Sequence, residues 1–546
     1  MADQSNFIPG NPVNIAIRPL EKGIIRNIPS EAVPKGGFVD IEDFRVGAKG
    51  LTRRGDWILD GRFDSFATSP PLRDVWIYWD TDGKRTTLGV DNEGVYEFAR
   101  AADGSYSATT ISMALNTLET FTYNGRLIGG LSYPDSTIIE NNLVVSDSEN
   151  VLRTYDGSTT ANLSASLTYI PTCITFFRDR LFIGQIQNDS SAFPRQRIRW
   201  SNVSPNYDTF DDSAYVDLPY TSGAIWRLIP FSSTLVAFLD DAIFMGRVTS
   251  SPNLPVYFEQ IETGGAGLVG MRAVTGWLDR LFFTGKNNVY ELTTKGIKPI
   301  GDPVMEEVLQ GMGTYSLAHT VMYTDTKAEK IGVVLSNFGT NLDVAWEMDL
   351  ATGAWSRISL PAAFGFIKET AISFPITIGT FADTSTTIGD ATGTFGDYTT
   401  DIGKKRLYFG GGESADFGYL ASIAVSTGYD FGSIPVQGSF ETGDIDLDIP
   451  NRRKLWTRFS MKIAGQLLST DEPITFKVDE SVDRGQGWKS LGTLVIAAGT
   501  DEGKINFRMS GAMIRFRVRQ TSANPPYTIV DMVLRAKPRG REDRYE

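Results

Sequence analysis

Short apolar runs alternate with polar turns along the whole chain, and several of these runs share one pattern. The segments "RDRLFIG" (Arg178–Gly184) and "LDRLFFTG" (Leu278–Gly285) both place bulky apolar residues after Asp-Arg and end on glycine. The runs "YNGRLIGG" and "KKRLYFGGG" repeat the Arg-Leu pair. Apolar, β-branched and aromatic runs bounded by glycine and polar turns are typical of β-strands. The pattern therefore predicts a chain of many short strands.

The apolar runs recur at a regular spacing. Their leading apolar residues are Val75, Leu127, Leu181, Leu235, Leu281, Ile331 and Leu407. A second run follows most of them after a polar turn, and a step of about fifty residues with four short strands is typical of a β-propeller blade. We predict an all-β fold, with a β-propeller of six or seven blades; the alternative, a β-solenoid, usually has much shorter coils. We expect the leucine of each Arg-Leu pair to pack between blades and the arginine to cap a turn.

One step of the repeat is longer than the others and contains a second periodic motif. Between Thr380 and Asp397, an apolar residue and an aspartate recur every seven residues. The residues concerned are Phe381, Asp383, Ile388, Asp390, Phe395 and Asp397. We predict an inserted interaction or gate loop, because long insertions often carry contacts. Calcium binding by the aspartates is the alternative, although one aspartate per seven residues supplies few ligands.

The pattern changes again near the C-terminus, where strands with one apolar and one charged face follow one another. In "MIRFRVRQ", Arg515, Arg517 and Arg519 alternate with apolar residues and so share one face. Such strands cover a core on one side only, which predicts a separate β-sandwich. We interpret the three arginines as a subunit-contact face; the alternatives are a solvated strand face and a nucleic-acid site.

These patterns divide the chain into four parts. We predict an N-terminal arm over 1–32, the propeller over 33–440 with its insertion at about 374–403, the sandwich over 441–535, and an exposed tail over 536–546.

Charge and candidate chemistry argue against several classes of function. The formal net charge of −13 disfavours a protein whose function is to bind nucleic acid tightly. The one cysteine, Cys173, excludes an internal disulfide, and we expect it to be buried and inert. The one histidine, His319, excludes a two-histidine metal site, and a structural role is expected for it. We find no catalytic motif and predict a protein that is not an enzyme and uses no cofactor or metal. We also expect no signal peptide and no membrane span.

The order of several motifs resembles a known family. The run "GIIRNIPSEAVPKGGFVDIEDFRVGAKGLTRRGDW" (Gly23–Trp57) looks like the start of the tail nozzle or tail hub proteins of short-tailed bacteriophages, which carry a β-propeller. Further similar motifs are "FFRDRLFIGQ", "RIRWSNVSPNYDTF", "VYELTTKGIKPIG", the Thr-Phe-Gly-Asp turns and "ETGDIDLDIPNRRKLWTRF". Each motif is weak alone, and their order over nearly the whole chain carries the resemblance.

The resemblance implies a structural virion protein that is assembled in the host cytoplasm. In such families six copies form a conduit through which the genome leaves, so we expect a homohexamer with an acidic lumen. The expected partners are the portal and adaptor complex, tail fibres, genomic DNA that passes without specific binding, and the host envelope during ejection. The alternative is a receptor-binding or polysaccharide-degrading phage tail protein.

Overall fold

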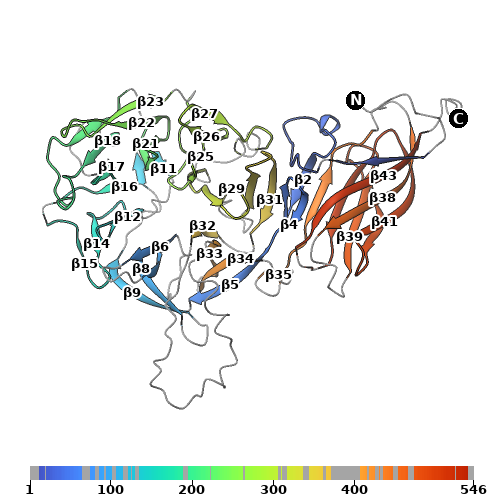
Figure 1. Ribbon diagram of the computed structural model, residues 1–546, viewed down its shortest axis with the longest axis horizontal. Helices are drawn as coiled ribbons and strands as arrows, with labels where there is room; N and C mark the ends of the chain where they lie inside the picture. Colours follow the sequence, from blue (N-terminus) through green and yellow to red (C-terminus); the bar gives the residue numbers. More distant parts are fainter. Residues whose placement is uncertain are drawn as a thin grey trace, which may run out of the picture.

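The computed structural model describes residues 12–370 and 406–538, apart from short gaps inside both ranges. Within these residues nearly every element is a strand, and a 3-10 turn, η2 (Ser30–Ala32), lies between the first two strands. The strands form a ring of small sheets, followed by a sandwich beside it (Figure 1). No helix in the described part of the chain is long and apolar enough to cross a membrane.

Six four-stranded antiparallel sheets and the first four strands of a nine-stranded sheet, β28 to β31, form the ring, which is a seven-bladed β-propeller. The first three blades in chain order are β6 (Asp74–Trp79), β7 (Arg85–Val90), β8 (Gly94–Arg100) and β9 (Tyr106–Ala114); β12 (Asp135–Ile139), β13 (Asn142–Ser146), β14 (Arg153–Tyr155) and β15 (Thr160–Asn162); and β16 (Pro171–Phe177), β17 (Arg180–Ile186), β18 (Arg197–Trp200) and β19 (Tyr215–Asp217). The next three are β20 (Ile225–Phe231), β21 (Thr234–Leu239), β22 (Ile243–Val248) and β23 (Val256–Ile261); β24 (Val274–Trp277), β25 (Arg280–Thr284), β26 (Val289–Thr293) and β27 (Gly296–Pro299); and β28 (Val321–Asp325), β29 (Lys330–Leu335), β30 (Val344–Asp349) and β31 (Trp355–Ser359).

The last blade closes the ring with a strand from the other end of the chain. Its strands are β32 (Phe364–Thr370), β33 (Arg406–Ser414), β34 (Phe417–Ala424) and β5 (Asp56–Phe63). The pairing of β5 with β34 is antiparallel, with Asp56 opposite Ala424. Two small ladders lie outside the blades: β10 (Phe121–Tyr123) with β11 (Arg126–Ile128), and β35 (Tyr429–Asp430) with β36 (Ile434–Pro435). Closure by β5 leaves the ring without an open joint between its first and last blades.

The repeated motif occurs where the first hairpin of a blade turns. Arg178 and Asp179 both have positive φ angles (50° and 60°), and Phe177 pairs with Arg180 across this two-residue turn. Two positive φ angles are the mark of a type I′ turn, whose twist matches that of the flanking strands. Glu140 and Asn141 make the equivalent turn between β12 and β13. The Arg-Leu pair is therefore the start of a blade's second strand.

The expected packing of the repeat leucines is confirmed for most copies. Leu181, Leu235, Leu281 and Ile331 are buried in second strands, and Leu181 packs between the β12–β15 and β16–β19 blades. Val75 lies in a first strand, β6, and is also buried, whereas Leu127 lies in β11, outside the blades; the side chains of Leu127 and Leu407 are outside the described part of the structure. The arginine does not cap its turn, because Arg180 Nη1 donates instead to Ser201 O after the third strand, at 2.7 Å.

The sandwich consists of two sheets. One has the order β3 (Phe44–Gly47), β4 (Gly50–Arg53), β43 (Thr528–Pro538), β38 (Lys454–Ala464) and β41 (Glu502–Gly511), with β1 (Val13–Ala16) also paired to β43. The other continues from β31 through β2 (Phe38–Glu42), β37 (Ser439–Thr442), β42 (Arg515–Gln520) and β39 (Ile474–Ser481) to β40 (Lys489–Ile496). A single nine-stranded sheet therefore runs from a propeller blade into the sandwich.

The predicted domain boundaries are wrong at the N-terminal end. The strands β1 to β4 belong to the sandwich, so the propeller begins at Asp56 and not at residue 33. Residues 13–16 are not a separate arm, because Val13 pairs with Ala536 in β43. That pairing also places the first residues of the predicted tail, 536–538, inside a strand. The physical reason is burial: Phe38 and Phe44 are 1% and 0% exposed and need the sandwich core to cover them.

Aromatic rings fill the core where the two sheets of the sandwich meet. Phe44 makes edge-to-face contacts with Phe440 and Tyr527, with ring centroids 6.0 and 6.1 Å apart. Phe459 of one sheet stacks on Phe516 of the other at 4.6 Å. Such pairs stabilise a core by about 0.5–1.5 kcal/mol beyond the area that they bury. Residues from both ends of the chain therefore share one core.

Candidate functional site

The first strands of the blades lie on the inner side of the ring, and neighbouring first strands contact one another. β12 contacts β16, β16 contacts β20, and β28 contacts both β24 and β32. The inner edge of a first strand has no neighbouring strand to bind its main-chain N–H groups, which therefore need other partners. Polar side chains at the axis can supply them.

Asp135, at the start of β12, is such a partner. Its Oδ2 accepts a hydrogen bond from the main-chain N–H of Ile174 in β16, at 3.1 Å. Its Oδ1 lies 3.1 Å from Nη1 of Arg227 in β20. Asp135 is 4% exposed, so its charge is largely removed from water. One buried carboxylate thus links three successive blades.

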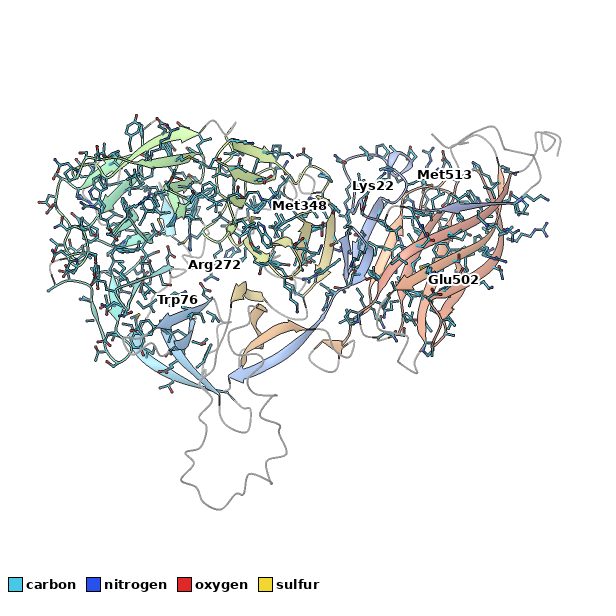
Figure 2. The ribbon with its side chains drawn as sticks, in the orientation of Figure 1. Lys22, Trp76, Arg272, Met348, Glu502 and Met513 are labelled. Carbon is cyan, nitrogen blue, oxygen red and sulfur yellow. The ribbon has the colours of Figure 1, made fainter. Side chains whose placement is uncertain are left out.

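A second ion pair spans the interior of the ring. Arg272 lies just before β24, and its Nη2 is 3.5 Å from Oδ2 of Asp74, the first residue of β6. The blades that hold these two residues are not neighbours, since the β28–β31 blade and the β5-containing blade lie between them. Figure 2 shows Arg272 in the interior of the ring. Asp74 also binds Trp76, whose Nε1 donates to Oδ2 at 3.1 Å.

We call Asp74, Asp135, Arg227 and Arg272 the axial cluster. Two carboxylates and two guanidinium groups balance each other, so the cluster has no formal net charge. Its acids bind main-chain N–H groups, and its cations connect blades that do not adjoin. The arrangement indicates a structural role, in which these ion pairs hold the blades together at the axis. Each charge already has a partner, and a buried charge without one is costly. Among the described residues, no group of three or more His, Cys, Asp or Glu side chains is placed to hold a metal ion.

Replacing Arg227 with methionine should lower the free energy of unfolding by about 1–3 kcal/mol, because the buried Asp135 loses its cation. A suitable control is Arg280→Met. Arg280 is as exposed as Arg227 (30% against 31%), but its partner Glu291 lies in the same blade. The control should cost less than about 1 kcal/mol. Equal losses in urea unfolding of the two variants would remove any special role for the axial cluster.

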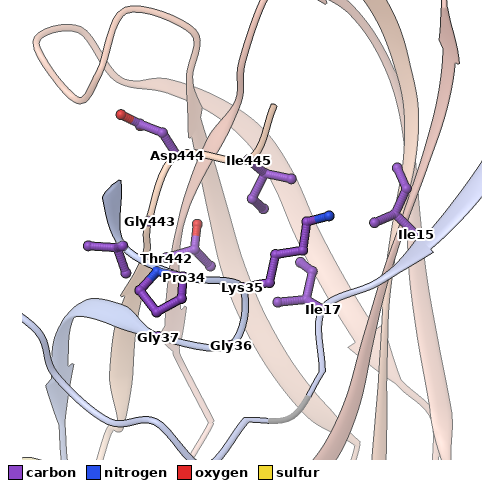
Figure 3. A pocket seen from close by; sticks show the side chains of 11 residues that line it. Ile15, Ile17, Pro34, Lys35, Gly36, Gly37, Thr442, Gly443, Asp444 and Ile445 are labelled. Atoms are coloured by element: carbon purple, nitrogen blue, oxygen red, sulfur yellow. The ribbon is translucent and has the colours of Figure 1, made fainter. Parts of the chain in front are cut away.

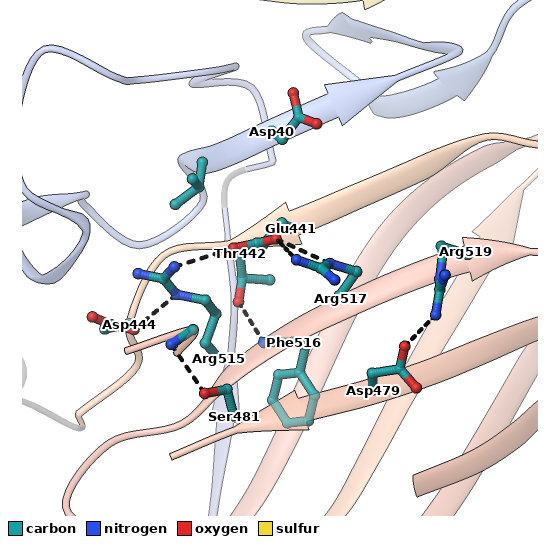
Figure 4. A network of polar contacts seen from close by, with 12 residues as sticks. Asp40, Glu441, Thr442, Asp444, Asp479, Ser481, Arg515, Phe516, Arg517 and Arg519 are labelled. Atoms are coloured by element: carbon teal, nitrogen blue, oxygen red, sulfur yellow. Dashed lines mark hydrogen bonds and ion pairs between the residues drawn. The ribbon is translucent and has the colours of Figure 1, made fainter. Parts of the chain in front are cut away.

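The three arginines predicted as a subunit-contact face are engaged within the chain. Arg515 is 6% exposed, and its guanidinium binds Glu441 at 3.1 Å and Asp444 at 2.9 Å (Figure 4). Arg517 pairs with Glu441 at 3.0 Å and lies over the ring of Trp488. Arg519 pairs with Asp479.

The subunit-contact interpretation of these arginines is therefore wrong for Arg515, which is buried. Arg517 and Arg519 are partly exposed, but the neighbouring strands β37 and β39 supply their counter-ions. Residue alternation correctly predicted the shared β42 strand. It could not reveal which acids lie opposite, because these come from positions 441, 444 and 479.

The other predicted site residues have different outcomes. Phe381, Asp383, Ile388, Asp390, Phe395 and Asp397 of the predicted interaction or gate loop lie outside the described residues. Cys173 and His319 are buried, at 0% and 1% exposure. Burial raises the pKa of the Cys173 thiol far above its ordinary value, with a smaller contribution from Asp135, so this thiol stays protonated and inert.

A small pocket lies between β1, the turn before β2 and the residues that follow β37 (Figure 3). It is lined by Ile15, Ile17, residues 33–37 and residues 442–445. Its volume of about 20 Å³ is close to what one water molecule requires. Pockets that bind cofactors or sugars are usually larger by more than tenfold. This pocket therefore offers no site for such a ligand.

Comparison with known proteins gives structural neighbours only. No family model matches the chain, and no curated protein matches it. Among solved structures, BamB from Moraxella catarrhalis is similar over 70% of this chain and 96% of its own, at 10% identity and a TM-score of 0.34. The extracellular domain of a putative one component system from B. thetaiotaomicron is similar over 91% of this chain and 63% of its own, at 12% identity and a TM-score of 0.38.

A quinonprotein alcohol dehydrogenase-like protein from Bacteroides thetaiotaomicron is also similar, over 52% of this chain and 65% of its own. Its identity is 6% and its TM-score 0.30. The propeller described above follows from the strand pairing of this chain itself, in which seven blades of four strands each form a ring.

Proposed function

We propose that this protein is a structural component of a short bacteriophage tail, a nozzle or hub of which six copies surround a conduit for the genome. The observation that carries the proposal is the nine-stranded sheet from β28 to β40, which makes the propeller and the sandwich one continuous body. A propeller and a sandwich that share one sheet cannot hinge there, which suits a subunit in the wall of a conduit. The order of tail-protein motifs along the sequence adds to this support.

The charges at the join between propeller and sandwich also favour a rigid wall. Arg357 of β31 binds both Asp40 and Glu42 of β2, at 3.0 and 2.7 Å. Arg26 binds the other carboxylate oxygen of Asp40 at 3.0 Å. These side chains are partly exposed, so each pair contributes modestly, and their connection into one network favours a fixed geometry over a hinge.

The overall charge suits a conduit through which DNA moves. With a formal net charge of −13 and a sequence pI of about 4.9, the protein repels phosphate at neutral pH. Basic walls would bind the duplex through counterion release, whereas acidic walls let it slide. In this proposal the protein lies below the portal and adaptor, contacts tail fibres, and does not act as an enzyme.

Light scattering of the purified protein, alone and with a portal–adaptor complex, tests the proposal. We expect six copies, formed either by the protein alone or on the complex. A stable trimer that ignores the portal–adaptor complex would contradict the proposal. That outcome would favour a receptor-binding or polysaccharide-degrading tail protein, and cleavage of host surface polysaccharide would then be assayed.

A further inference from the structure

The outer face of the sandwich sheet formed by β43, β38 and β41 carries a group of cations. β41 alternates strictly, with Lys504, Asn506 and Arg508 exposed and the residues between them turned to the core. Arg458 of β38 stands opposite both Asn506 and Arg535 in the strand register. We call Arg458, Lys504, Arg508, Arg535 and Lys537 the basic face.

The basic face differs from the arginines of β42 in having no counter-ions. None of its five cations forms an ion pair with another described residue, and Arg458 donates only to the neutral Asn506, at 2.9 Å. Paired charges occur at one border of the face, where Lys462 binds Asp501 and Arg18 binds Asp531. Five unpaired cations on a chain of net charge −13 indicate a surface that meets an acidic partner.

The positions between these cations carry no aromatic side chain. Leu455, Asn506 and Ser510 lie between them, so these positions offer no aromatic ring on which a base or a sugar could stack. Nucleic-acid and sugar sites generally combine charge with such rings. The face is therefore better suited to the folded, acidic surface of a protein.

An acidic surface that could complement the basic face lies at the far end of the same molecule. The segment between β18 and β19 exposes Asp208, Asp211 and Asp212, and none of these carboxylates has an ion-pair partner among the described residues. Val203 and Tyr215, 47% and 38% exposed, flank them and add apolar area. Figure 1 places β18 at the end of the propeller away from the sandwich.

We propose that the basic face of one copy binds the Asp208–Asp212 segment of the next, in a head-to-tail contact between copies of this chain. Two different surfaces at opposite ends of a molecule make a heterologous interface, which closes into a ring or continues as a filament. This contact would specify how the copies meet in the proposed tail. The choice of a ring over a filament rests on that proposed function. Complementary charges steer such contacts and set their register, and their effect falls as salt screens them.

A charge-exchange experiment tests the contact. One variant carries K504E, R508E and R535E, and the other carries D208K, D211K and D212K. Each variant alone presents like charges at both surfaces, so each should remain a monomer where the wild type assembles. An equimolar mixture restores opposite charges at every contact and should assemble with alternating copies. Light scattering at low and at high salt measures all four samples, and wild-type assembly should weaken by about tenfold or more at high salt.

Several outcomes would overturn the contact. Assembly of either variant alone, or failure of the mixture although both variants keep the wild-type melting temperature, would do so. Binding of the wild type to duplex DNA or heparin through the basic face, without self-association, would assign that face to another partner. The proposed tail role is tested separately, because a wild-type protein that binds the portal–adaptor complex in six copies keeps that role even if this contact is wrong.

Discussion

Replacing Arg45 with methionine is expected to lower the free energy of unfolding by about 3–5 kcal/mol, the usual loss when one partner of a buried ion pair is removed. Arg45 of β3 binds Glu347 at 2.7 Å and Asp325 at 3.1 Å in the β28–β31 blade. The side chains of the two acids are 0% and 6% exposed. Without Arg45, both carboxylates would remain in the interior with no cation, so the join between blade and sandwich should open first.

The buried group around Arg45 includes a tyrosine that depends on the same charge. Tyr323 donates its hydroxyl to Glu347 at 2.7 Å. Burial, with Glu347 nearby, raises the pKa of Tyr323 well above its ordinary value, so the hydroxyl stays protonated and remains a donor. Tyr323 alone cannot replace the guanidinium, since a neutral donor compensates a buried carboxylate only in part.

Arg247→Met is the matched control for Arg45→Met. Arg247 binds Glu259 at 3.1 Å on the propeller surface, where the two side chains are 67% and 48% exposed. Exposed pairs contribute about 0–1 kcal/mol, so this variant should unfold almost like the wild type. Urea denaturation of both variants measures the contrast. A loss below about 1 kcal/mol for Arg45→Met would mean that the join does not depend on the ion pair.

Gly50→Ala should be the most damaging single-methyl addition in the sandwich. Gly50 starts β4 with a φ of +127°, and a Cβ there would lie 2.1 Å from the carbonyl oxygen of Ile529. That oxygen belongs to the main chain of β43 and cannot move without disturbing the sheet. We expect a loss of more than about 3 kcal/mol in urea unfolding, from strain and steric overlap together.

Gly296→Ala separates these two causes. Gly296 has nearly the same φ, +130°, but no heavy atom within 4 Å of the position that a Cβ would take. This variant should therefore show the backbone strain alone, about 1–3 kcal/mol. The difference between the variants measures the steric overlap with β43. Similar losses at both positions would contradict the close approach of β4 and β43.

Much of the propeller could be predicted from the sequence, because its repeated signals are local. Six of the seven blades turn their first hairpin within two to five residues and follow it with a buried strand, as at Arg178–Leu181, and only the blade with the insertion between β32 and β33 departs from this. Spacing and alternation therefore predicted the ring and the strand orientation in β42. The seven blades lie within the predicted range of six or seven.

The remaining features depend on contacts between distant residues. Phe38 and Phe44 look like any strand residues near the start of a propeller. Only the pairing of β2 with β37 and of β4 with β43 places their strands in the sandwich. The axial cluster was also missed, since Asp135 and Arg227 meet across a whole blade. A weak signal was present: Asp74 and Asp135 each stand directly at the start of a first strand.

The pairing of chain ends has a consequence for synthesis on the ribosome. β4 ends at Arg53, but its partner β43 begins only at Thr528. At a synthesis rate of roughly 5–20 residues per second, about 25–95 seconds pass between the synthesis of β4 and that of β43. Meanwhile Phe38, Phe44 and Leu51, all at most 1% exposed in the folded chain, have no core to enter. The nascent protein is therefore a natural client for chaperones that shield apolar segments, and its yield should depend on them more than that of a propeller closed by local strands alone.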